Sequence, residues 1–133
     1  MALRRTKLLN IQSVTGIATV GIFTVGTTNT GGGVGIASTT YLRGVVMHNT
    51  GLGSATSSLY VYPSSTAVSG VGVTAHRLVR VDLAANETFF FEMNYPLVLV
   101  NQEKIVVEVT APASGGTGIG SAINYQILGD TDI

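Results

Sequence analysis

The chain has 133 residues, of which 45% are hydrophobic and only 11% are charged, and its seven basic residues are balanced by seven acidic ones. This length suits one domain with a single core, and the zero net charge excludes long-range attraction to nucleic acid or to an anionic membrane. The absence of cysteine excludes disulfide bonds and thiolate metal sites.

Residues 1–14 are predicted to form a short N-terminal arm that carries Arg4, Arg5 and Lys7. The arm lacks the continuous apolar run of a signal peptide, and no apolar run in the chain approaches the roughly 20 residues that span a membrane. We therefore expect a chain that is neither secreted nor anchored in a membrane.

Residues 15–129 are predicted to form one all-β domain, because short apolar segments alternate there with clusters of Gly, Ser, Thr, Asn and Pro. No segment has the periodicity of a convincing amphipathic helix. The stretches 27–38, 63–74 and 112–120 are expected to be loops rich in glycine, serine or threonine. The expected strands are 15–25, 40–48, 57–62, 77–83, 87–93, 97–100, 104–110 and a last one around 123–127.

The alternation within these strands predicts which side chains share a face. In 77–83 and 104–110 every second residue is Val, Ile or Leu, which is typical of a strand that is buried on one face. Three consecutive phenylalanines cannot all enter one core, so Phe89 and Phe91 are placed on one face and Phe90 on the other. In 40–48 the alternation predicts two sets: Leu42, Val46 and His48, and Tyr41, Val45 and Met47.

About eight strands joined by glycine-rich loops are typical of an antiparallel β-sandwich of jelly-roll type. The strands carry apolar residues on both faces, which is unusual for a monomer because one face of an antiparallel sheet normally meets water. We therefore expect the second face to be covered by another subunit. The aromatic residues expected at that contact are Tyr41, Tyr60, Tyr62 and Phe90.

The two ends of the chain carry opposite charges. The predicted acidic tail, 130–133, contains Asp130 and Asp132, and the predicted arm contains Arg4, Arg5 and Lys7. Opposite ends of neighbouring copies are expected to pair, and simple solvation of both ends is the alternative. Each exposed ion pair contributes only about 0–1 kcal/mol, so such pairs would set the register of the contact while apolar burial supplies its affinity.

The sequence contains no recognisable catalytic constellation. His48 and His76 are the only histidines, and neither lies in a zinc-ligand motif. The nucleophile motif Gly-x-Ser-x-Gly is absent, and most of the seven acidic residues lie at outward or turn positions. We therefore expect no enzyme activity, no metal and no cofactor. A carbohydrate-binding module in which Tyr60 and Tyr62 stack on a sugar ring is the alternative from another functional class.

Six segments carry characteristic strand and turn signatures: 22–25 (Ile-Phe-Thr-Val), 41–51 (Tyr-Leu-Arg-Gly-Val-Val-Met-His-Asn-Thr-Gly), 59–63 (Leu-Tyr-Val-Tyr-Pro), 83–88 (Leu-Ala-Ala-Asn-Glu-Thr), 96–99 (Pro-Leu-Val-Leu) and 105–107 (Ile-Val-Val). These signatures resemble those of small structural proteins of tailed-phage virions. The resemblance extends from Ile17 to Leu128. Asn86 stands where that family usually has glycine, and Gly26 stands where it often has proline.

The resemblance implies a non-enzymatic β-sandwich subunit of a virus particle, assembled in the host cytoplasm. The first function that the resemblance implies is that of a capsid decoration or cement protein that stabilises the phage head. Such a protein is expected to form a homo-oligomer, with a trimer as the first expectation. A tail, baseplate or fibre component is the alternative. The implied partners are a major capsid protein or a tail component, and no binding to nucleic acid or to a membrane is expected.

Overall fold

The computed structural model describes residues 3–15, 17–25, 39–51, 53–100, 102–110 and 122–132, with the backbone alone for 3–10, 131 and 132. These residues form strands and one short 3-10 helix, and no helix among them is long and apolar enough to cross a membrane. The elements are β1 (Leu3–Thr15), β2 (Ala18–Thr24), β3 (Thr39–Asn49), β4 (Ala55–Tyr62), η1 (Thr74–His76), β5 (Arg77–Leu83), β6 (Thr88–Val100), β7 (Lys104–Thr110) and β8 (Ala122–Asp132).

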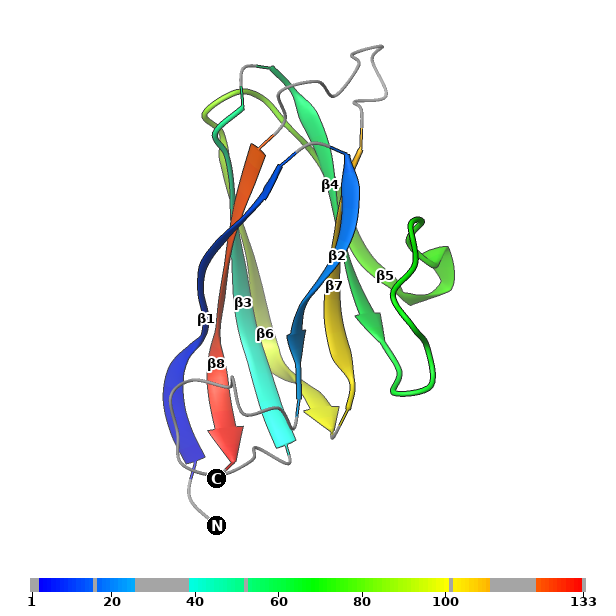
Figure 1. The fold of residues 1–133 in the computed structure, drawn as a ribbon. Coiled ribbons are helices and arrows are strands. Elements are labelled where there is room, and N and C mark those ends of the chain that lie inside the picture. The colour runs from blue at the N-terminus through cyan, green and yellow to red at the C-terminus, as the bar shows by residue number, and fades with distance from the viewer. Residues whose placement is uncertain are drawn as a thin grey trace.

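The eight strands form two antiparallel four-stranded sheets that face each other as a sandwich (Figure 1). Sheet A has the order β1-β8-β3-β6, and sheet B has the order β2-β7-β4-β5. The pairing is nested, because β1 pairs with β8, β2 with β7, β3 with β6 and β4 with β5. The expected all-β sandwich is confirmed, and the nested pairing is the order that results when one long antiparallel ribbon is wound over a two-sheet core.

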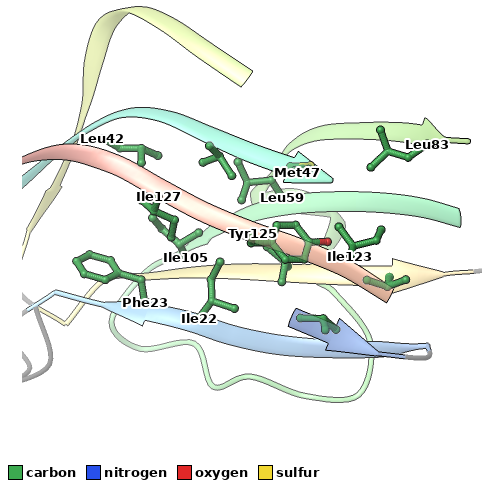
Figure 2. Close-up of a cluster of buried hydrophobic side chains, with 14 of the residues drawn as sticks. Ile22, Phe23, Leu42, Met47, Leu59, Leu83, Ile105, Ile123, Tyr125 and Ile127 are labelled. Carbon is green, nitrogen blue, oxygen red and sulfur yellow. The ribbon is translucent and has the colours of Figure 1, made fainter. Parts of the chain in front are cut away.

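The core lies between the sheets and is made by the alternating inward side chains of both (Figure 2). The face predicted for 104–110 is confirmed, since Ile105, Val107 and Val109 are fully buried. Tyr125 contributes a hydroxyl group to this cluster (Figure 2). This hydroxyl lies 2.6 Å from the Ser57 hydroxyl, within hydrogen-bonding distance. Burial raises the pKa of Tyr125 to about 12, so the phenol stays neutral at every physiological pH.

Both ends of the chain differ from the prediction. The expected arm is strand β1 at the edge of sheet A, and the expected acidic tail is the end of β8. Arg4 pairs with Thr131 and Arg5 with Asp130 along the backbone ladder, so the two ends meet within one chain. This strand was not predicted because register shifts between Lys7 and Leu9 and beyond Leu9 break the alternation of its inward and outward residues.

The predicted strands 87–93 and 97–100 are one strand, β6, interrupted by a wide bulge. Leu42 pairs with Leu97 and Gly44 with Glu92, so the four residues 93–96 lie opposite the single residue Arg43. The same irregularity corrects the faces assigned to β3. Leu42 is buried with Val45 and Met47, whereas Tyr41 lies on the opposite side, because a bulge shifts the alternation by one residue.

Asn86 explains one departure from the phage sequences that the chain resembles. It lies in the turn between β5 and β6 with φ of 63°, a left-handed conformation that glycine adopts most readily. Asparagine is among the residues that tolerate this region. The substitution of Asn for the usual glycine is therefore compatible with the same turn.

Candidate functional site

The outer face of sheet B is covered by the chain itself over β4 and β7, whereas the outward residues of β5 are exposed. The segment 63–76, which we name the strap, runs from the end of β4 to the start of β5 outside the sandwich (Figure 1). Beneath it Tyr60, Tyr62 and Val106 form a second, smaller buried cluster, against which Val73 of the strap packs. The expectation that Tyr60 and Tyr62 are outward contact residues is therefore wrong, since both are buried in the chain.

A set of polar contacts holds the strap on sheet B. Glu108 of β7 accepts hydrogen bonds from the Tyr60 hydroxyl at 2.6 Å and from the Gly72 amide at 3.0 Å. The Tyr62 hydroxyl accepts a hydrogen bond from the Val73 amide at 2.9 Å. The Lys104 ammonium donates to the Thr66 carbonyl at 2.6 Å. The strap is thus fastened near both ends to side chains of the sheet.

Glu108 makes this fastening sensitive to pH. Partial burial on its own would raise the pKa of Glu108, but hydrogen bonds from Tyr60, Gly72 and Thr19 and the charge of Arg77 outweigh it and lower the pKa. A carboxylate whose pKa is lowered in the folded chain stabilises it above the pKa of the unfolded chain. That contribution is lost as the pH falls through the folded-state pKa.

We expect Glu108→Gln to lower the free energy of unfolding at neutral pH by about 1 kcal/mol, because charge-assisted hydrogen bonds are replaced by neutral ones. Thermal unfolding followed from neutral to acidic pH measures this loss. The curves of wild type and variant should converge at low pH, where Glu108 is protonated in both states of the wild type. Two pH profiles that stay parallel down to acidic pH would contradict the role of the carboxylate.

In contrast, no segment that the structure describes covers the outer face of sheet A over β3, β6 and β8. Phe90, Val98 and Val100 of β6 are each about half exposed, at 51%, 50% and 52%. We name the apolar residues of this side the A face; they are Ile11, Tyr41, Val46, Phe90, Val98, Val100 and Leu128. The predicted outward position of Phe90 is confirmed, and its partners Phe89 and Phe91 pack on the core as the alternation requires.

Neighbouring residues fix the position of the Phe90 ring on the A face. A Cβ atom at Gly44 would lie 3.1 Å from Cε1 and 3.4 Å from Cζ of its ring, so the ring lies over the backbone of β3. Val46, the cross-strand partner of Phe90, is half-buried beside it. The ring is therefore positioned by its own sheet with much of its surface still exposed.

Three charged side chains lie beside these apolar side chains. Arg43 Nε lies 2.8 Å from Asp130 Oδ2, with the arginine side chain 47% exposed and the aspartate 8% exposed. Asp130, expected to be part of a solvated tail, is therefore buried against Arg43 of the same chain. Glu92 is exposed on β6 opposite Gly44. The backbones of Arg4, Arg5, Lys7 and Asp132 lie in β1 and β8, and their side chains lie outside the described residues.

At one end of the A face is a shallow pocket of about 200 Å³, lined by Ile11, Val46, His48, Asn124, Tyr125 and Gln126. Within it, His48 Nδ1 lies 2.7 Å from the Thr88 hydroxyl. His76 instead lies on the strap, with its ring 5.7 Å from that of Tyr62. The two histidines therefore belong to opposite sides of the sandwich. No cluster of His, Asp or Glu that could hold a metal occurs among the residues that the structure describes.

Part of this surface was not predicted from the sequence. Val98 and Val100 alternate with the inward Leu97 and Leu99, and this alternation indicates that they face outward. Tyr95, the most exposed large apolar residue of the described chain at 88%, projects from the bulge of β6. Its position depends on the pairing of β6 with β3, which periodicity does not reveal.

No family model and no curated protein matches the sequence. The chain is similar in structure to chains of infectious bursal disease virus. The similarity to a chain of the T13 viral particle has a TM-score of 0.49 and 11% identity, and it covers 98% of this chain and 30% of that one. For the Gx strain the TM-score is 0.45 with 12% identity, and for the Gt strain it is 0.40 with 10% identity. This chain spans about a third of the length of those proteins, covering 31% and 32% of the latter two.

Proposed function

We propose that the chain is a non-enzymatic structural subunit of a virus particle, and that it assembles through the A face. The first role we assign to it is that of a decoration or cement subunit on the head of a tailed phage. In this role it binds a major capsid protein and further copies of itself, with a trimer as the first expectation for its oligomeric state.

The open A face is the observation that carries this proposal. A soluble monomer gains nothing from holding Phe90, Val98 and Val100 half exposed on one sheet, whereas a subunit buries such side chains on assembly. The zero net charge agrees with this, because it opposes association of copies less than a strong net charge would. The strap leaves sheet A as the side that is available for contact.

The nested strand order supports the same role at the level of the fold. Eight strands arranged as β1-β8-β3-β6 and β2-β7-β4-β5 correspond to the jelly-roll type of sandwich, a fold used by viral capsid domains, by lectins and by cupins. Since one fold serves several functions, the surface has to decide among them.

The other functional classes have less support. The sugar-binding alternative depended on Tyr60 and Tyr62, whose rings lie beneath the strap. A metal-dependent enzyme would need a ligand cluster, and none occurs among the described residues. A tail or baseplate position is the second candidate within the virion, and we rank it below the head because the sequence shows a compact unit without the repeats of an elongated fibre.

The proposal is tested by labelling intact virus particles with gold-conjugated antibodies raised against the purified protein. We expect label on the particles, distributed over the head. Label confined to the tail would contradict the head position and support the second candidate, a tail or baseplate component. Particles that carry no label, from cultures in which the protein is produced, would overturn the proposal.

A further inference from the structure

We infer that the A face is a homotypic contact, in which a second copy of this chain docks against β3 and β6 around Phe90. The inference rests on the proposed function only in assuming that the contact forms within a virus particle. The contact itself is argued from the surface.

The exposed apolar side chains lie on one face of neighbouring strands, in two groups on either side of the bulge in β6. Phe90 lies opposite Val46, and Val98 lies opposite Tyr41, in the antiparallel ladder of β3 and β6. On the other side of β3, Leu128 of β8 lies opposite Gly44. Residues that are opposite each other in such a ladder have adjacent side chains on one face.

The surface is large enough for a stable contact between two copies. A standard interface takes about 800 Å² from each partner, of which a little over half, or roughly 450 Å², is apolar. The A face has seven side chains, two of them aromatic; three are about half exposed, Ile11 is more exposed and the other three are partly buried. Together they offer apolar area on the order of 500 Å².

The charges of the face favour a copy of the chain over a charged partner. Arg43 uses Nε for Asp130, and its guanidinium is still partly exposed next to Gly44, which lies opposite the exposed Glu92. Where the surfaces of two copies meet, Arg43 of one copy can lie against Glu92 of the other. Among the side chains that the structure describes, this face thus has one accessible cation and one accessible anion, which makes it complementary to a second copy of itself.

The geometry of β6 favours contact through the face over pairing through its edge. β6 is an edge strand of sheet A. The bulge at 93–96 interrupts its ladder, and Pro96 has no amide hydrogen to donate to another strand. Continuous edge-to-edge pairing of two copies is therefore blocked in the middle of the strand.

The test is sedimentation velocity of the full chain over a concentration series, with circular dichroism as the check of folding. We expect the wild type to self-associate and Phe90→Ser to weaken that association about tenfold or more, because an aromatic side chain at the centre of a contact dominates its affinity. Val71→Ser is the matched control, since Val71 is 72% exposed but lies on the strap. This control should associate like the wild type.

A second pair of variants tests the self-complementary charges. Glu92→Lys should weaken association, because it places a cation against Arg43 of the other copy. Arg80→Glu, at an exposed position of β5, changes the net charge by the same amount in the opposite direction and should have little effect. Equal effects of the two charge changes would contradict the contact that we infer.

The outcomes separate this inference from the proposed function. A wild type that stays monomeric at its solubility limit but labels virus particles would overturn the homotypic contact and leave the function standing. Association that Phe90→Ser and Val71→Ser reduce equally would also overturn it. Association through the A face by a protein that never labels particles would confirm the contact and refute the function.

Discussion

Replacing Asn49 by alanine is expected to lower the free energy of unfolding by about 3 kcal/mol, because three hydrogen bonds are lost and buried groups are left unpaired. Asn49 is fully buried at the end of β3. Its amide nitrogen donates to the carbonyls of Gly53 and Leu83, both at 3.0 Å, and its side-chain oxygen accepts from the Gly51 amide at 2.8 Å. One side chain thus joins the turn after β3 to the end of β5.

The measurement is thermal unfolding, in which this loss corresponds to a fall in Tm of about 10 °C. Asn94→Ala is the matched control, because Asn94 is exposed on the bulge of β6, and its change should stay within about 0.5 kcal/mol. A melting temperature of Asn49→Ala equal to that of the control would show that the hydrogen bonds of Asn49 do not hold this end of the sandwich.

Replacing Gly72 by alanine should release the strap. The new Cβ would overlap the ring of Tyr60, with Cε1 at 2.7 Å, and Tyr60 is 1% exposed and cannot move aside without opening the smaller core cluster. The strap must therefore shift, which also disturbs the hydrogen bond from the Gly72 amide to Glu108. We expect a cost of about 2 kcal/mol, which raises the open population of the strap roughly 30-fold.

Limited proteolysis with thermolysin measures this opening, since the strap contains Val68, Val71 and Val73 as cleavage sites. Cleavage should accelerate in proportion to the open population. Gly70→Ala is a close control, because a Cβ at Gly70 meets no atom within 4 Å. Equal cleavage rates for the two variants would refute the fit of Gly72 on Tyr60.

The fold was predictable where periodicity is strong. Strands β5 and β7 have the bounds that alternation predicts, because in each strand every second residue packs on the core. β1 was missed because it is an edge strand that carries charged residues and register shifts, so its alternation is irregular. The predicted total of eight strands is right although it counted β6 twice and omitted β1.

The candidate site was predictable only in part. Phe90 was placed correctly, since three adjacent phenylalanines must divide between two faces. Tyr60 and Tyr62 were placed correctly outside the main core but not recognised as buried, because the segment that covers them has no periodic pattern. The position of an irregular loop thus decides which of the two apolar sheet faces stays exposed. The alternation of residues within strands does not predict where such a loop lies.

Hydroxyl-radical footprinting of the protein, free at low concentration and bound in isolated virus particles, tests most directly whether the A face is buried in the working state. We expect labelling of Phe90, Val98 and Val100 to fall strongly in the particle, while Val71 on the strap keeps its reactivity. Unchanged labelling of Phe90 and Val98 in the particle, or protection of the strap alone, would contradict this account.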